Sequence, residues 1–115
     1  KTFITPPNAT LLITNRSGKE GLEERYRDRL IGIGVDPENL VTRTATEDAT
    51  PTRMLALTKS WQDADYYTGL FGIGKQQKDS FPVIDDKEVV LELVLGTDAA
   101  RNAIALDLAT VQSQR

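Results

Sequence analysis

The stretch Thr10-Leu11-Leu12-Ile13-Thr14-Asn15-Arg16-Ser17-Gly18 passes from a short apolar run into a polar elbow, and it sets the first corner of the fold. The apolar run predicts a central β-strand over Thr10 to Thr14. Ser17 is followed three residues later by Glu20, a spacing that matches a capping box and predicts a helix starting at the elbow. The local order is therefore strand, elbow, helix.

The elbow, made of Asn15, Arg16, Ser17 and Gly18, is a candidate binding site for an anion. The first N–H groups of a helix have no partner within the helix, and the helix dipole is positive at that end. Capping the helix is the more frequent use of such a sequence. We therefore prefer the capping interpretation and keep anion binding as the alternative.

Hydrophobic periodicity then predicts the rest of the first half. Leu22, Tyr26 and Leu30 recur at helical spacing, and Ile33 continues their stripe. A second strand is predicted over Leu40 to Thr46, followed by a polar connection of hairpin length. Thr52 to Thr58 is interpreted as a strand rather than a helix, because the run is short and a new helical pattern begins after Ser60.

The second half repeats this organisation, which predicts two strand–helix–strand units. The segment 74–87 is predicted to be a loop, with Phe81 to Ile84 as an edge strand or a hydrophobic plug. Glu88 to Leu95 is the strongest predicted strand. A last helix is predicted from its apolar stripe, which consists of Ala100, Ile104, Leu108 and Val111.

These elements predict an α/β two-layer sandwich with βαββαβ order, a four-stranded sheet and an extra C-terminal helix. We prefer a ferredoxin-like arrangement, in which the second and third strands form an antiparallel hairpin. A mixed or parallel sheet is the alternative. In a parallel sheet, Asn15 and the segment 96–98 would share one edge and could form one anion site.

Composition limits the function classes. The chain has 115 residues and a net charge of −3. We expect one domain over 10–111, with a lead-in over 1–9 and a frayed tail over 112–115. No basic cluster suggests nucleic-acid binding. The chain contains neither histidine nor cysteine, and no convincing acid pair. We therefore predict no catalytic residue, no metal site and no cofactor.

Aromatic residues gather at the start of the second helix, where Trp61, Tyr66 and Tyr67 occur. Tyr67 shares a helical face with Phe71, which predicts that it lies in the core. Tyr66 falls on another face, and Trp61 lies on the flank at the helix start. Because aromatic rings suit both sugars and protein interfaces, Trp61 and Tyr66 are the best candidates for recognising a glycan or a partner.

Three stretches in order resemble the LytR C-terminal domain, which is found behind LytR/CpsA/Psr catalytic modules and in other actinobacterial envelope proteins. The first strand with its elbow and Gly21-Leu22 resembles the family's "VxNGSGxxGLA" opening. The segments 52–55 and 64–72 resemble its threonine strand, its alanine-bearing helix and its "LG" exit. The segment 93–98 resembles its closing "VVLGxD". Arg16 departs from this pattern, because the family usually has glycine there.

The resemblance implies a non-catalytic, extracytoplasmic accessory domain of a bacterial cell-envelope protein. Such a domain would bind cell-wall polymer or an envelope protein, and it would be tethered to the membrane through sequence absent from this chain. Because the chain begins with Lys1, we expect it to be an excised piece. Two alternatives stay open. One is an enzymatic role assisting phosphoryl-linked transfer of wall polymers. The other is a purely oligomerising domain that forms homo-oligomers through an exposed apolar patch around Phe81 to Ile84 or on the last helix.

Overall fold

The computed structural model describes residues 5–99. Its strands and helices, in chain order, are β1 (Leu11–Asn15), α1 (Leu22–Gly32), β2 (Leu40–Thr44), β3 (Arg53–Ala56), α2 (Ala64–Phe71), β4 (Lys75–Gln77), β5 (Val83–Ile84), β6 (Lys87–Glu88) and β7 (Leu91–Leu95). Two single 3-10 turns, η1 (Pro37–Asn39) and η2 (Thr58–Ser60), precede β2 and α2. Within these residues, no helix has the length and apolar character needed to cross a membrane.

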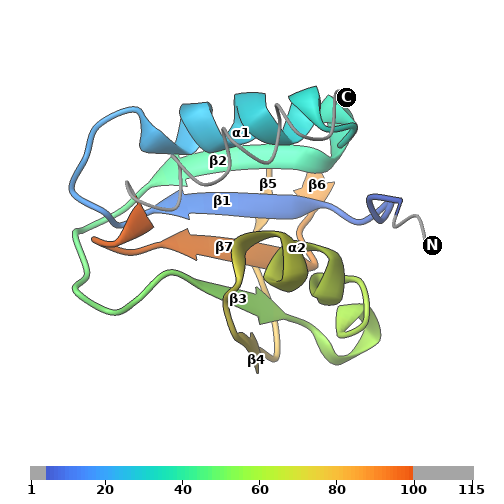
Figure 1. The fold of residues 1–115 in the computed structure, drawn as a ribbon. Helices are drawn as coiled ribbons and strands as arrows, with labels where there is room; N and C mark the ends of the chain where they lie inside the picture. Colours follow the sequence, from blue (N-terminus) through green and yellow to red (C-terminus); the bar gives the residue numbers. More distant parts are fainter. Residues whose placement is uncertain (1–4, 100–115) are drawn as a thin grey trace.

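Five strands form one mixed sheet in the order β2-β1-β7-β3-β4, and β5 and β6 form a separate hairpin. β1 is parallel to both β2 and β7, whereas β3 is antiparallel to β7 and parallel to β4. Two βαβ units therefore lie side by side with β7 between them (Figure 1). The predicted α/β two-layer sandwich is confirmed in its mixed-sheet form.

The preferred ferredoxin-like arrangement is wrong. It required an antiparallel hairpin between the second and third strands, but β1 and β7 separate β2 from β3. The inner edge of β2 is occupied by β1, with Ile13 paired to Thr42 at the middle of the ladder. The short connection 45–52 instead runs past the carboxyl ends of β1 and β7. The predicted four strands are in fact five, because β4 adds an outer strand.

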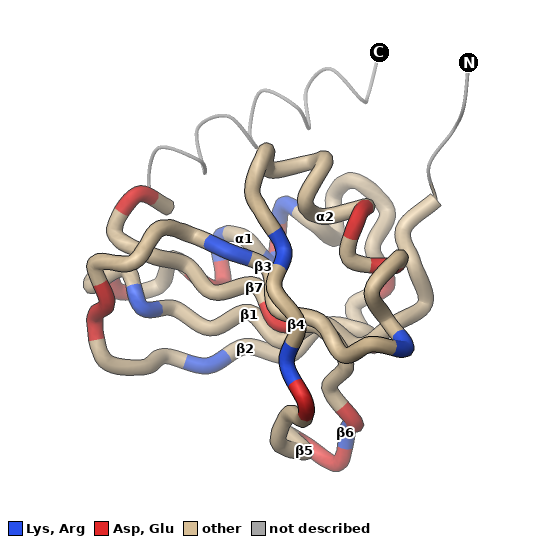
Figure 2. The backbone as a smooth tube through the Cα atoms, turned by 90° about the horizontal axis from the view of Figure 1, so that it is seen from below, with Lys and Arg blue, Asp and Glu red and all other residues tan. Residues whose placement is uncertain are grey.

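Both helices cover one face of the sheet, and the β5–β6 hairpin lies on the other side (Figure 2). The main core lies between the helices and the sheet, where Tyr26, Leu30, Tyr67 and Leu93 are fully buried. The apolar residues of β1 are buried on both faces of the sheet: Leu11 and Ile13 belong to the main core, and Leu12 belongs to a second core on the other face. A continuous apolar run is typical of such a central strand. The helical stripe of Leu22, Tyr26 and Leu30 is confirmed.

The predicted capping box is not formed. Helix α1 begins at Leu22, its N-cap is Gly21 at φ 82°, and no side chain caps it. Gly18 also has a positive φ, of 80°. These two glycines turn the chain before the helix starts, so Ser17 and Glu20 lie outside it. The Ser17 Oγ instead accepts a hydrogen bond from the Lys19 N–H at 3.0 Å.

The loop predicted over 74–87 contains β4 and the β5–β6 hairpin. Phe81 and Ile84 pack against a small second core, so the hydrophobic plug is confirmed. That core consists of Leu12, Val41 and Val89. The strand interpretation of the segment 52–58 is confirmed by β3. The predicted last helix and the tail 112–115 lie outside the described residues.

Candidate functional site

The six candidate site residues fall into two separate regions. Asn15, Arg16, Ser17 and Gly18 lie at the carboxyl end of β1, whereas Trp61 and Tyr66 follow β3. β7 is parallel to β1, and β3 runs antiparallel to β7. The carboxyl ends of β1 and β3 therefore lie at opposite ends of the strands in the sheet. The elbow and the aromatic residues therefore cannot belong to one site.

The elbow is held together by Asn15, whose side chain is buried and fully engaged. Its Nδ2 donates to the Lys19 carbonyl at 2.7 Å and to the Glu23 Oε1 at 2.9 Å. Its Oδ1 accepts from the Ser17 N–H at 3.0 Å and from the Ser17 Oγ at 2.6 Å. Arg16 points its Nη1 at the Thr46 carbonyl, 3.1 Å away. These bonds fix a turn and leave Asn15 no free donor for a ligand.

Parallel pairing does bring Asn15 and the end of β7 to one edge, as the alternative arrangement required. Gly96 at this edge lies against the backbone of the 45–52 connection, where an added Cβ would fall 2.0 Å from the Thr50 carbonyl oxygen. The Gly96 N–H donates to the Thr52 Oγ1, and the Thr52 N–H donates to the Asp98 Oδ1. These two N–H donors are thus used within the chain.

Glu23 joins this edge to helix α1. It accepts from Asn15, as above, and its Oε2 accepts from the Thr44 Oγ1 at 3.1 Å. Burial alone would raise the pKa of Glu23, but hydrogen bonds from Asn15, the backbone and Thr44 outweigh it. The net effect is a lowered pKa, so the carboxylate is stabilised in its charged form.

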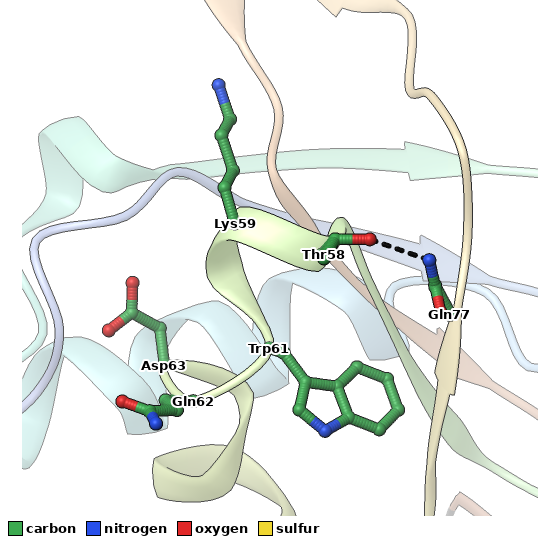
Figure 3. Close-up of a pocket in the computed structure, with 6 residues that line it drawn as sticks. All are labelled: Thr58, Lys59, Trp61, Gln62, Asp63 and Gln77. Atoms are coloured by element: carbon green, nitrogen blue, oxygen red, sulfur yellow. Dashed lines mark hydrogen bonds between the residues drawn. The ribbon is translucent and has the colours of Figure 1, made fainter.

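A hollow of about 460 Å³ lies beside Trp61, near the carboxyl end of β3 (Figure 3). It is lined by Thr58, Lys59, Trp61, Gln62, Asp63 and Gln77. The turn η2 and the residues after it supply five of these side chains, and β4 supplies Gln77. Trp61 is 36% exposed, although most large apolar side chains of this domain are buried.

The indole of Trp61 is held in position from one side. Lys75 places its Nζ 4.3 Å from the centre of the ring, which is cation–π distance. The same Nζ donates to the Trp61 carbonyl at 3.0 Å and to the Asp65 Oδ1 at 2.6 Å. A ring fixed in this way loses little conformational entropy when a ligand stacks on its exposed surface.

The polar lining is partly fixed and partly available. The Gln77 Nε2 donates to the Thr58 Oγ1 at 2.6 Å (Figure 3). The side chains of Gln62 and Asp63 make no hydrogen bond or ion pair with any residue in the range 5–99. Lys59 extends away from the indole and pairs with Glu88 at 3.1 Å, but both side chains are largely solvent-exposed. This pair is therefore weak.

Tyr66 is only partly exposed. It packs against the main core, and its ring meets that of Tyr67 edge to face at 5.1 Å. Burial raises the pKa of the Tyr66 hydroxyl. Tyr66 borders a smaller hollow of about 200 Å³, which shares Gln62 and Asp63 with the hollow beside Trp61.

No protein-family model matches the chain, and no curated protein matches it. Among solved structures, the chain is similar to the solution structure of the C-terminal domain of RV0431. The two share 22% sequence identity with a TM-score of 0.46, over 84% of this chain and 80% of that chain.

Sequence reasoning found Trp61 but missed the polar residues around it. Gln62 and Asp63 directly follow the tryptophan, so their proximity was available from the sequence. Gln77 was not, because its place depends on the parallel pairing of β3 with β4, which sets Ala56 beside Gln77. Among the described residues, no group of acidic side chains is arranged to hold a metal ion.

Proposed function

We propose that this chain is a non-catalytic accessory domain that binds a polysaccharide of the bacterial cell wall through the hollow beside Trp61. The observation that carries the proposal is an exposed indole, fixed by Lys75, next to a hollow whose other lining residues all carry hydrogen-bonding side chains. Such a combination of one apolar face and several polar groups is what a sugar ring requires of its binding site.

Each part of the hollow has a counterpart in a sugar. The apolar C–H face of a pyranose ring can stack on the indole. Its hydroxyl groups can donate to the Asp63 carboxylate, and hydroxyl or N-acetyl oxygens can accept from the Gln62 amide. Because the Asp63 carboxylate would repel a negatively charged group, it favours neutral sugars over acidic ones.

The lining supports binding rather than hydrolysis. Hydrolysis of a glycosidic bond generally uses two carboxyl groups placed on either side of the bond. Among the six residues that line the hollow, Asp63 is the one carboxylate. The motifs that resemble the LytR C-terminal domain support the cellular context: an envelope protein anchored through sequence outside this chain, with its accessory domain facing the wall.

Tryptophan fluorescence tests the proposal directly, because Trp61 is the only tryptophan in the chain. Soluble fragments of bacterial cell wall should change its emission in a saturable manner. Retention on insoluble wall should be lost in Trp61→Ala and weakened in Gln62→Ala. Val83→Ala is the control, since Val83 is exposed and is not among the residues that line the hollow. Equal retention of wild type and Trp61→Ala would refute wall binding through this hollow.

The oligomerising alternative has less support. It called for an exposed apolar patch around Phe81 to Ile84 or on the last helix. Phe81 and Ile84 pack against the second core, and the last helix lies outside the described residues. Val83 is the large apolar residue of this segment that is clearly exposed, at 67%. Light scattering at high protein concentration would reveal a dimer, and Val83→Asp should dissociate it if the hairpin forms the contact.

A further inference from the structure

A buried carboxylate occupies the sheet face that the helices do not cover. Glu92 lies on β7, the central strand, and its side chain is 3% exposed. Its Oε2 accepts a hydrogen bond from the Thr14 Oγ1 at 2.5 Å and one from the Arg43 Nη2 at 3.2 Å. Packing does not require a charge here, because an apolar side chain would fill the same position and generally be at least as stable.

Glu92 faces two cations rather than one. The Lys78 Nζ lies 3.5 Å from its Oε1, and the Arg43 Nη2 contacts its Oε2. Together, these three side chains carry one net positive charge. The side chains of Arg43 and Lys78 are 36% and 40% exposed, so this net charge faces solvent. It does so on a chain whose net charge is −3.

The two cationic groups are also held in fixed positions. Arg43 donates from its Nε to the Thr14 Oγ1 at 3.1 Å in addition to its bond with Glu92. Lys78 lies 4.9 Å from the centre of the Phe81 ring, and its backbone N–H donates to the Ala56 carbonyl at 2.9 Å. Arg43 comes from β2, whereas Lys78 directly follows β4. Strands at opposite edges of the sheet thus direct their cations to the central carboxylate.

We propose that Arg43 and Lys78, positioned by Glu92, form a binding site for the phosphate groups of an extended polyanion. The Nε and Nη2 atoms of Arg43 already bond within the domain. The remaining N–H groups of its planar guanidinium can donate to a phosphate, whose geometry they match. The Lys78 ammonium adds a second positive charge beside it. The site lies on the face opposite the helices, so it is separate from the hollow beside Trp61 and does not depend on the function proposed for that hollow.

The site can be tested by following the backbone amide resonances of the domain during titration with sodium tripolyphosphate. Resonances of Arg43, Lys78 and Glu92 should shift together, and affinity should fall as sodium chloride is added. Lys78→Gln should weaken binding by about tenfold, as expected for loss of one charge-assisted contact. Lys59→Gln removes an exposed lysine beside the hollow and should change affinity little.

Arg43 needs a double variant, because removing it alone leaves Glu92 buried with less compensation. Arg43→Gln combined with Glu92→Gln removes both charges and should also weaken binding by about tenfold. Glu92→Gln alone should strengthen it, since the opposing negative charge is gone while Arg43 keeps an oxygen to bond.

Three results would overturn the proposal: affinity unchanged in Lys78→Gln and in the double variant, weaker binding by Glu92→Gln, or equal binding of polyglutamate, which would assign the surface to acidic polypeptides. Equally tight binding of single inorganic phosphate ions would argue against an extended ligand. Trp61→Ala should bind tripolyphosphate normally, which separates this result from failure of the wall-binding hollow.

Discussion

At the scale of single residues, two buried tyrosines differ in how their hydroxyl groups are satisfied. The Tyr26 hydroxyl donates to the Ala99 carbonyl at 2.6 Å. The Tyr67 hydroxyl is buried with no hydrogen-bond partner in the described part of the chain. Burial, followed by the nearby Tyr66 and Asp63, raises the pKa of Tyr67, so it stays protonated at neutral pH. A buried hydroxyl without a partner costs about 1–3 kcal/mol of desolvation.

The two tyrosines should therefore respond differently to the same substitution. Tyr67→Phe removes an unsatisfied group and should leave stability unchanged or raise it by about 1 kcal/mol. Tyr26→Phe leaves the Ala99 carbonyl without this donor and should lower stability by about 1 kcal/mol. Urea unfolding of both variants and the wild type measures the difference. Equal destabilisation by the two substitutions would mean that Tyr67 has a bonded partner in solution.

Residue-level features of the candidate site were only partly visible in the sequence. Trp61 was found because a tryptophan at the flank of a predicted helix has no core face to occupy. Glu92 was missed, because a single acidic residue within the predicted strand Glu88 to Leu95 does not by itself indicate a buried ion pair. Its buried state depends on Arg43 and Lys78, which come from strands that sequence periodicity does not pair with β7.

At the scale of elements, Glu23 fastens helix α1 to the sheet. It lies in the first turn of α1 and accepts from Asn15 at the end of β1 and from Thr44 at the end of β2. A negative charge at this position also suits the helix dipole. This contact, rather than the predicted capping box, fixes the start of the helix. The sequence predicted this helix but neither its first residue nor its cap, because the partners of Glu23 come from two other strands.

The lowered pKa of Glu23 predicts a pH dependence of stability. In the unfolded chain Glu23 binds its proton at a higher pH than in the folded domain. The stabilisation is thus complete above the unfolded pKa of about 4.5 and is lost as pH falls through the lower folded value. Glu23→Gln should reduce this acid destabilisation, as followed by urea unfolding between pH 7 and pH 3. Thr44→Val removes one of the bonds and should give an intermediate effect. An unaltered pH profile in Glu23→Gln would contradict the assignment.

At the scale of the whole molecule, β7 unites the two βαβ units. It pairs with β1 along one edge and with β3 along the other, although it comes near the end of the described chain. Periodicity in the sequence identified these strands but not their order, because a short connection between two strands predicts a hairpin only when neither strand has a better partner. Here β2 pairs with β1, which leaves the edge of β7 for β3. That choice depends on packing across the whole sheet.

Because every strand of the sheet connects to β7 directly or through one neighbour, the domain should unfold as a single unit. Trp61 fluorescence reports on the second βαβ unit, whereas far-UV circular dichroism reports on both. Their urea transitions should coincide. Leu93→Ala removes a fully buried side chain at the centre of β7 and should lower stability by about 3 kcal/mol in both signals equally. Val83→Ala, at an exposed position, should cost less than about 0.5 kcal/mol. If the fluorescence transition of Leu93→Ala preceded the dichroism transition, the two units would be independently stable and β7 would be only a shared neighbour.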